Sequence, residues 1–134
     1  MNRRKAREYA FCILFAREFQ PDVPAEDFYS SETENLEIDG DEYIHKVFFG
    51  VEENLEKIDE KISKYAIGWK NDRLSKVSLA ALRLCIYEMQ NLDDVPAAVA
   101  INEALEICKK FDYDSAHTFV NGILNAIYKE SEGK

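Results

Sequence analysis

The sequence predicts an all-α protein that folds as one helical domain over residues 1–134, with about six to seven helices. The length of 134 residues fits one domain rather than two. Only five glycines and three prolines are present. The chain reads as long segments of helical period with few turn clusters between them, which makes sandwiches, barrels and Rossmann folds poor candidates.

The first helix is predicted to run from a cap at Asn2 to about Phe19. Pro21 ends it, because the residue before a proline avoids helical backbone angles. Pro24 is then expected to open a short acidic helix that reaches about Ser31.

The segment from Asp41 to Ala66 has apolar residues in alternating steps of four and three. These residues are Ile44, Phe48, Val51, Leu55, Ile58, Ile62 and Tyr65. Such a heptad stripe fits one long helix or two nearly collinear helices. With two helices, the break is expected at Gly50 or Asn54.

A linker at 67–71 leads to Ser78, which is placed to cap a strongly apolar helix through Gln90. A turn follows. Pro96, at the first helical position, then starts an amphipathic helix that extends to Phe111.

The last helix is predicted over residues 116–128, with Asp114 or Ser115 as its cap. The residues after it form a polar tail that is expected to fray. No internal repeat or low-complexity tract interrupts this series of helices.

The composition argues against several classes of protein. No apolar run reaches the ~18 residues of a membrane span, and residues 1–20 carry charges through their middle, unlike a signal peptide. A cytoplasmic protein is therefore expected. Cys12, Cys85 and Cys108 lie in separate apolar segments without a C-x-x-C motif, so neither a disulfide framework nor a zinc site is indicated.

No catalytic signature is present either. His45 and His117 have no cysteine or carboxylate at ligand spacing, so no metal is expected. The sequence contains no Gly-rich phosphate loop, zinc-protease motif or serine elbow. We expect no cofactor and no enzyme activity.

Charge is distributed unevenly along the chain. The net charge is −9. Residues 1–20 hold five basic and two acidic side chains, whereas residues 22–60 hold two basic and fourteen acidic ones. A basic first helix on an acidic body suggests an interaction arm.

The basic residues of the first helix share a face. At 100° per residue, Arg3, Arg4 and Arg7 fall within one arc of about 100°. Such an arc can grip successive phosphates and stack on unpaired bases, which favours RNA as a ligand. The alternative is a solvated helix start, but cations there oppose the helix dipole.

The same helix is apolar on two sides. Phe11, Phe15 and Phe19 form a stripe about opposite the expected core stripe. Either the helix is packed all round or a partner covers this second stripe. Packing within the domain is favoured for Phe11, and Phe15 is the better candidate for a partner contact.

Glu88 lies among apolar neighbours on the helix that ends at Gln90. A lone carboxylate there is either paired internally, with Arg17 or Arg83, or satisfied by a donor from a partner protein. The pattern alone favours the internal pair.

Several strings and their order resemble the NusB family of transcription antitermination factors. They are Arg3-Arg4-Lys5-Ala6-Arg7-Glu8, Ile13-Leu14-Phe15, Trp69 with Arg73, Leu82-Arg83-Leu84, Tyr87-Glu88, Val95-Pro96, Ile101-Asn102-Glu103-Ala104 and Phe119-Val120-Asn121-Gly122-Ile123-Leu124. The likeness covers residues 3–19 and 69–125 well, and residues 21–66 only as an acidic helical connection. Two departures are Phe15, where the family often has tyrosine, and Ser78-Leu79, where it often has Asp-Arg.

The resemblance implies a NusB-like fold and a binding function. Such a protein pairs with NusE, a ribosomal small-subunit protein, and binds single-stranded boxA-type RNA of ribosomal operons in an RNA polymerase antitermination complex. By the same analogy, the RNA contacts are Arg3, Arg4, Lys5, Arg7, Tyr65, Asp114 and Phe119, and the NusE contacts are Phe15 and Glu88.

Two alternatives remain at this point. One is a helical protein-interaction adaptor that uses the acidic body. The other is a stand-alone relative of the RNA-binding domain of ribosomal RNA cytosine methyltransferases, although a chain ending at Lys134 leaves no room for a catalytic domain. The sequence also leaves open whether the free chain forms a homodimer.

Overall fold

The computed structural model describes residues 1–66, 74–112 and 116–132. Within these ranges the chain is all-α, as predicted, with seven helices and no strand. The helices are α1 (Arg3–Arg17), α2 (Ala25–Asn35), α3 (Glu42–Glu53), α4 (Leu55–Tyr65), α5 (Lys76–Asn91), α6 (Ala97–Phe111) and α7 (Ala116–Glu132).

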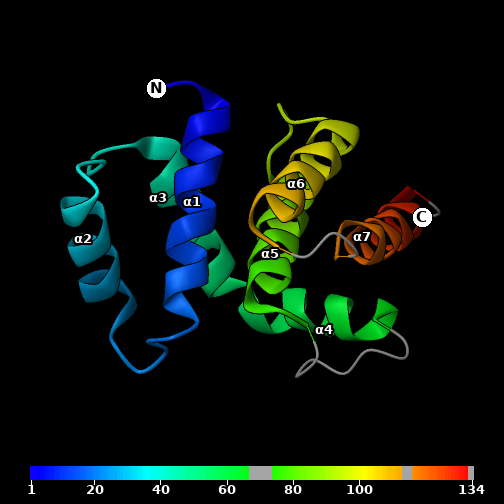
Figure 1. The fold of residues 1–134 in the computed structure, drawn as a ribbon, viewed down its shortest axis with the longest axis horizontal. Helices are drawn as coiled ribbons and strands as arrows, with labels where there is room; N and C mark the ends of the chain where they lie inside the picture. Colours follow the sequence, from blue (N-terminus) through cyan, green and yellow to red (C-terminus); the bar gives the residue numbers. More distant parts are fainter. Residues whose placement is uncertain (67–73, 113–115, 133–134) are drawn as a thin grey trace.

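Helix α5 lies near the centre of the molecule and packs against α1, α3, α4, α6 and α7 (Figure 1). Its sequence is apolar on most sides, and residues such as Leu82, Leu84 and Ile86 are fully buried. Helix α2 lies at one outer edge beside α1, and α7 lies towards the opposite edge (Figure 1). Among the described helices, none combines the length and the continuous apolar sequence that a membrane span requires.

Helix α1 begins as predicted, because the Asn2 side chain accepts a hydrogen bond from the backbone N–H of Lys5 at 2.8 Å. It ends at Arg17, two residues before the predicted end.

Helix α2 is longer than predicted and ends at Asn35 instead of Ser31. Its end is a Schellman motif, in which the N–H of Ile38 donates to the carbonyl of Thr33 at 2.9 Å. Glu37 takes the left-handed conformation there, with φ of 57°. Since glycine usually occupies that position, the sequence carried no clear stop signal.

The stripe from Asp41 to Ala66 forms two helices, and they are separated at Asn54. The Asn54 side chain donates to the carbonyl of Gly50 at 2.8 Å, which closes the end of α3. Gly50 lies inside α3 and serves close packing. A Cβ added there would lie 2.3 Å from the Tyr87 ring of α5.

Ser75, and not Ser78, caps α5: its hydroxyl accepts from the backbone N–H of Ser78 at 2.9 Å. The prediction for Ser78 was wrong because α5 begins one turn earlier, at Lys76, so Ser78 lies inside the helix, where it is buried and, like Ser75, donates to Asp112 at the end of α6. Pro96 immediately precedes α6 and is not its first residue.

Helix α7 extends to Glu132, past the predicted end at residue 128. The predicted linker at 67–71 and the proposed caps Asp114 and Ser115 lie outside the described residues. Cys85 and Cys108 are buried among apolar neighbours, and burial raises the pKa of the Cys108 thiol to about 12.

Candidate nucleic-acid and partner interface

The N-terminal end of α1 carries three exposed cations, which we call the basic end: Arg3, Arg4 and Lys5. The Arg3 guanidinium lies 4.5 Å from the centre of the Tyr43 ring and 3.6 Å from an Asp94 carboxylate oxygen. Arg4 donates from Nε to Glu103 at 3.1 Å, while 73% of its side chain stays exposed. Its terminal nitrogens are therefore open to a ligand.

Arg7 does not belong to this exposed surface, contrary to the sequence prediction. Its side chain is only 5% exposed and donates two hydrogen bonds to Glu88, from Nε at 2.8 Å and from Nη2 at 2.9 Å. A third nitrogen, Nη1, lies 3.7 Å from Glu103. The helical wheel placed Arg7 on the correct arc, but that part of the arc faces α5 and α6.

Glu88 is therefore satisfied within the protein. The internal pair favoured by the pattern exists, but its partner is Arg7 and not Arg17 or Arg83. The expectation that a partner protein's donor satisfies Glu88 is wrong for this structure, since 1% of the side chain is exposed.

Arg17 and Arg83 have other partners. Arg17 donates to Glu52 at 2.5 Å. Arg83 donates to Asp59 and to Glu18, at 2.6 to 2.9 Å.

Electrostatics favour the charged form of Arg7. Burial would lower the pKa of Arg7, but the hydrogen bonds and charge of Glu88 outweigh it and raise that pKa above its ordinary value. Burial and the Glu88 charge together raise the pKa of the neighbouring Tyr43. The pair thus fixes α1, which carries the basic end, against α5.

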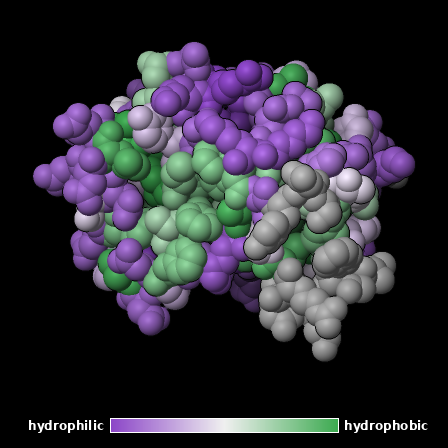
Figure 2. Space-filling model, in the orientation of Figure 1, coloured by the Kyte–Doolittle hydropathy of each residue, from purple (hydrophilic) through white to green (hydrophobic). Residues whose placement is uncertain are grey.

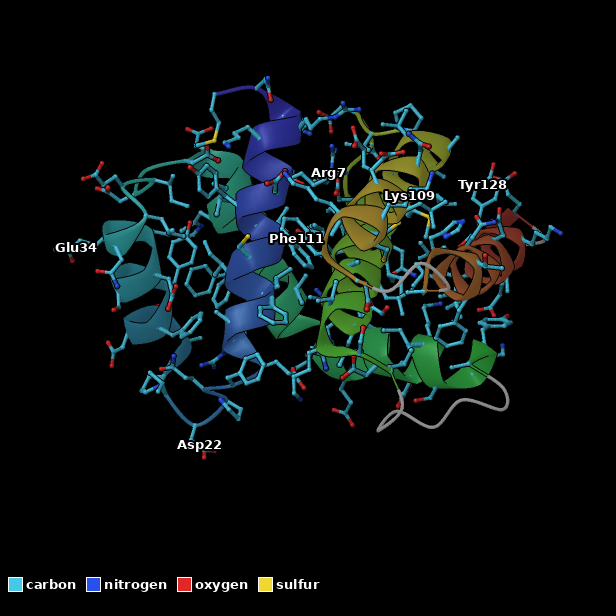
Figure 3. All side chains as sticks on the ribbon, viewed as in Figure 1. Arg7, Asp22, Glu34, Lys109, Phe111 and Tyr128 are labelled. Atoms are coloured by element: carbon cyan, nitrogen blue, oxygen red, sulfur yellow. The ribbon has the colours of Figure 1, made fainter. Side chains whose placement is uncertain are left out.

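A hollow of about 360 Å³ lies between α1 and α6. Its charged lining consists of Arg4, Arg7, Lys109 and Lys110 with the carboxylates Glu8, Glu103 and Glu106. The two lysines are exposed, and they pair with carboxylates of this lining: Lys110 with Glu8 at 2.9 Å and Lys109 with Glu106 at 3.8 Å. Figure 3 shows Lys109 on α6, on the side of the molecule towards α7. Sequence reasoning missed these two lysines, although their place just after the buried Ile107 and Cys108 signals the polar face of a helix end.

The other expected RNA contacts lie elsewhere. Tyr65, at the end of α4, donates to Glu130 of α7, which also accepts from Lys64 at 2.9 Å. The hydrogen bonds from Tyr65 and Lys64 lower the pKa of Glu130 to about 2. Phe119, on the first turns of α7, is half-buried against the core. Asp114 lies outside the described residues.

The expected RNA contacts therefore form two groups. The basic end belongs to α1, and Tyr65 and Phe119 belong to α4 and α7, which lie on the other side of α5 (Figure 1).

A strip of phenylalanines lies along α1 and the end of α6. This aromatic strip consists of Phe11, Phe15, Phe19 and Phe111, with successive ring centres 5.2 to 6.3 Å apart. Phe11 is buried, as predicted, whereas Phe19 is 59% and Phe111 41% exposed. Figure 2 shows the resulting apolar area near the centre of this face. Exposed aromatic area of this kind is typical of a protein-binding surface.

Comparison with known proteins decides the family. The sequence model of the NusB family matches residues 4–129.

The chain belongs to the NusB family.

Curated NusB relatives align over nearly the whole chain. The transcription antitermination protein NusB of Natranaerobius thermophilus is 45% identical, covering 95% of this chain and 94% of its own. That of Clostridium perfringens is 40% identical, covering 98% and 100%. Members of the NusB family are non-enzymatic antitermination proteins, and the chain is accordingly an antitermination protein. These matches favour neither the adaptor nor the methyltransferase-derived domain.

Solved NusB structures share the fold. A Thermotoga maritima NusB structure has a TM-score of 0.86 at 36% identity, covering 97% of this chain and 92% of its own. A chain in a crystal structure of antitermination factors NusB and NusE in complex with dsRNA has a TM-score of 0.83 at 30% identity, covering 96% of both.

Within the described part of the chain, no group of three or more His, Cys, Asp or Glu side chains is placed to hold a metal ion.

Proposed function

We propose that the chain binds single-stranded boxA-type RNA of ribosomal operons together with NusE, and that this complex acts on RNA polymerase in the cytoplasm. One observation carries the RNA part of this proposal. The basic end presents three exposed cations on a protein whose net charge is −9. The solved relative that holds NusE and RNA supports the choice of partners.

The RNA-binding residues that we propose differ from the sequence prediction. Arg3, Arg4 and Lys5 contact phosphates, and Lys109 and Lys110, across the hollow between α1 and α6, add contacts when phosphate replaces their pairs with Glu106 and Glu8. Arg7 does not contact RNA in this proposal. It positions the basic end, because its hydrogen bonds to Glu88 hold α1 in place.

Tyr65, Asp114 and Phe119 form a second proposed contact with RNA. The rings of Tyr65 and Phe119 suit stacking on unpaired bases. Glu130 binds Tyr65 in the free protein, so RNA that engages the Tyr65 hydroxyl displaces this carboxylate.

NusE is proposed to cover the aromatic strip, with Phe15 at its centre. Phe15 packs between Phe11 and Phe19 and is partly exposed. Glu88 contributes indirectly, since it holds Arg7 and therefore α1. The sequence left open whether the free chain forms a homodimer, and such a homodimer would use the same exposed strip. Sedimentation of the free chain tests for this homodimer.

Filter binding with boxA RNA, with and without NusE, tests the proposal. We expect weak, poorly selective binding by the chain alone, because its acidic body repels RNA, and much tighter binding with NusE. A triple variant, Arg3→Gln, Arg4→Gln and Lys5→Gln, should reduce the salt slope by about 0.7 per lost contact, ~2 in total.

The matched control removes three exposed lysines elsewhere. Its substitutions are Lys46→Gln, Lys57→Gln and Lys129→Gln. The control should change the salt slope little. Equal slopes for the two triple variants would remove the basic end from the RNA site.

A further inference from the structure

Four charged side chains form a continuous network from α5 to the surface of the hollow between α1 and α6. Glu88 holds Arg7 with two hydrogen bonds, at 2.8 and 2.9 Å. Nη1 of Arg7 lies 3.7 Å from Oε1 of Glu103 on α6, and this same oxygen accepts from Nε of Arg4 at 3.1 Å. The exposed fraction of the side chains rises along the network, from 1% at Glu88 to 73% at Arg4.

Glu103 occupies a fixed position in this network. Its side chain is 13% exposed, and Ala104 and Ile107 of the same helix are buried in the core. On the side of α1 it faces Arg7, which Glu88 already fixes, and Figure 3 shows Arg7 between α1 and α6. An ion pair between two mobile surface side chains contributes little, but here one of the two partners of Arg4 and Glu103 is held by its surroundings.

The contact with Glu103 leaves the phosphate-binding end of Arg4 free. Glu103 accepts from Nε, so the terminal nitrogens of the guanidinium remain available to a phosphate. Arg3 differs in this respect. Asp94, which is 70% exposed, approaches its terminal nitrogen Nη2 at 3.6 Å, where it competes with a phosphate.

The hydrogen bond and the charge of Glu103 act on RNA in opposite directions. A free arginine side chain loses rotamer freedom when it binds a phosphate, and a hydrogen bond that already orients it reduces this cost. The negative charge of Glu103, in contrast, repels the phosphate. Substitutions that remove only the charge can therefore be compared with substitutions that remove both.

We propose that Glu103 is a positioning residue for RNA binding: it holds Nε of Arg4, so that the terminal nitrogens of Arg4 meet the phosphate already oriented. Glu103 itself does not touch the RNA. This inference rests on the proposed function, in which Arg4 contacts a phosphate, and it adds a residue of α6 to the machinery of the basic end.

Filter binding of boxA RNA in the presence of NusE tests the role of Glu103 with two substitutions of similar size. Glu103→Gln and Glu103→Met both remove the charge, but only glutamine keeps a strong acceptor for Nε of Arg4. Glu103→Met should bind RNA about four-fold more weakly than Glu103→Gln. Glu103→Gln should bind at least as tightly as the unmodified chain, because the repulsion of phosphate is gone.

Two controls separate positioning from a general effect on α6. Glu106 lines the same hollow and lies 3.8 Å from Lys109, beyond hydrogen-bond distance, so Glu106→Gln and Glu106→Met should bind RNA equally. In an Arg4→Ala background, the difference between glutamine and methionine at position 103 should disappear. A loss of packing on α6 would persist in that background.

Circular dichroism establishes that each variant is folded. Should Glu103→Met fail to fold, Arg4→Lys decides the question. Lysine keeps the charge, but its single ammonium group cannot both donate to Glu103 and offer a separate fork to the phosphate, so RNA binding should weaken about three-fold. Unchanged binding of Arg4→Lys overturns the proposal.

The outcomes distinguish this inference from the proposed function. Weaker RNA binding by Arg4→Ala, combined with equal binding by Glu103→Gln and Glu103→Met, overturns the positioning role alone. A difference that persists in the Arg4→Ala background, or that appears equally at Glu106, overturns it as well. If Arg4→Ala binds RNA like the unmodified chain, the phosphate contact of the proposed function fails, and the role of Glu103 fails with it.

Discussion

Removing Glu88 should destabilise the whole fold. In Glu88→Ala the Arg7 guanidinium, which is 5% exposed in the unmodified protein, loses both of its hydrogen bonds to the Glu88 carboxylate and keeps only Glu103, 3.7 Å from Nη1. Breaking a buried pair on one side costs about 3 to 5 kcal/mol, because the remaining charge stays buried without its hydrogen bonds. At a urea slope of about 2 kcal/mol per molar, the unfolding midpoint should fall by about 2 M.

A double-mutant cycle identifies the cause. Replacing both partners, as in Arg7→Met with Glu88→Leu, leaves no buried charge and should recover most of the loss, with a coupling of about 2 kcal/mol or more. The exposed pair of Glu106 and Lys109 provides the control, since both side chains are more than half exposed. Glu106→Ala should cost about 0.5 kcal/mol or less.

Urea titrations followed by far-ultraviolet circular dichroism measure all of these variants. The reasoning is refuted if Glu88→Ala costs no more than Glu106→Ala. A Glu88→Ala protein that keeps its stability but binds NusE tens-fold more weakly would show instead that this carboxylate is a direct partner contact.

Three further predictions follow from local geometry. Gly50→Ala should lower the free energy of unfolding by about 1 to 3 kcal/mol despite the better helix propensity of alanine, since its Cβ would meet the Tyr87 ring at 2.3 Å; an unchanged or higher urea midpoint contradicts this. Ser75→Ala should cost about 1 kcal/mol by removing the cap of α5, again by urea titration, and an unchanged midpoint would mean that the cap contributes nothing. Because the folded pKa of Glu130 is lowered to about 2, its contact with Tyr65 contributes stability above the ordinary carboxyl pKa of 4.5 and loses it as the pH falls towards 2. The difference in Tm between the unmodified chain and Glu130→Gln should therefore be largest near pH 6 and shrink below pH 4, and a constant difference contradicts the assignment.

The sequence was most informative where neighbouring residues decide the structure. The cap at Asn2, the all-α class and the break of the 41–66 stripe at Gly50 or Asn54 all depend on backbone hydrogen bonds and side chains within a few residues of each other. The end of α2 was missed because Glu37 adopts a conformation that glycine usually takes. The cap of α5 was misplaced because Ser78 and Ser75 are equally good capping residues and both hydroxyls donate to Asp112. What distinguishes them is the start of the helix, since Ser75 has extended backbone and Ser78 already lies in the first turn.

By itself, the sequence determined which helices form, which faces of them are apolar, and that a basic helix start is joined to an acidic body. The helical period and the charge pattern are set by residues that lie close together in the sequence. They can therefore be recognised without the tertiary structure. Only the tertiary structure decided that Arg7 faces Glu88, 81 positions away, and leaves the basic end to Arg3, Arg4 and Lys5. A helical wheel gives the direction of a side chain but not the helix that lies in that direction, because packing between distant segments is set by the burial of the whole core.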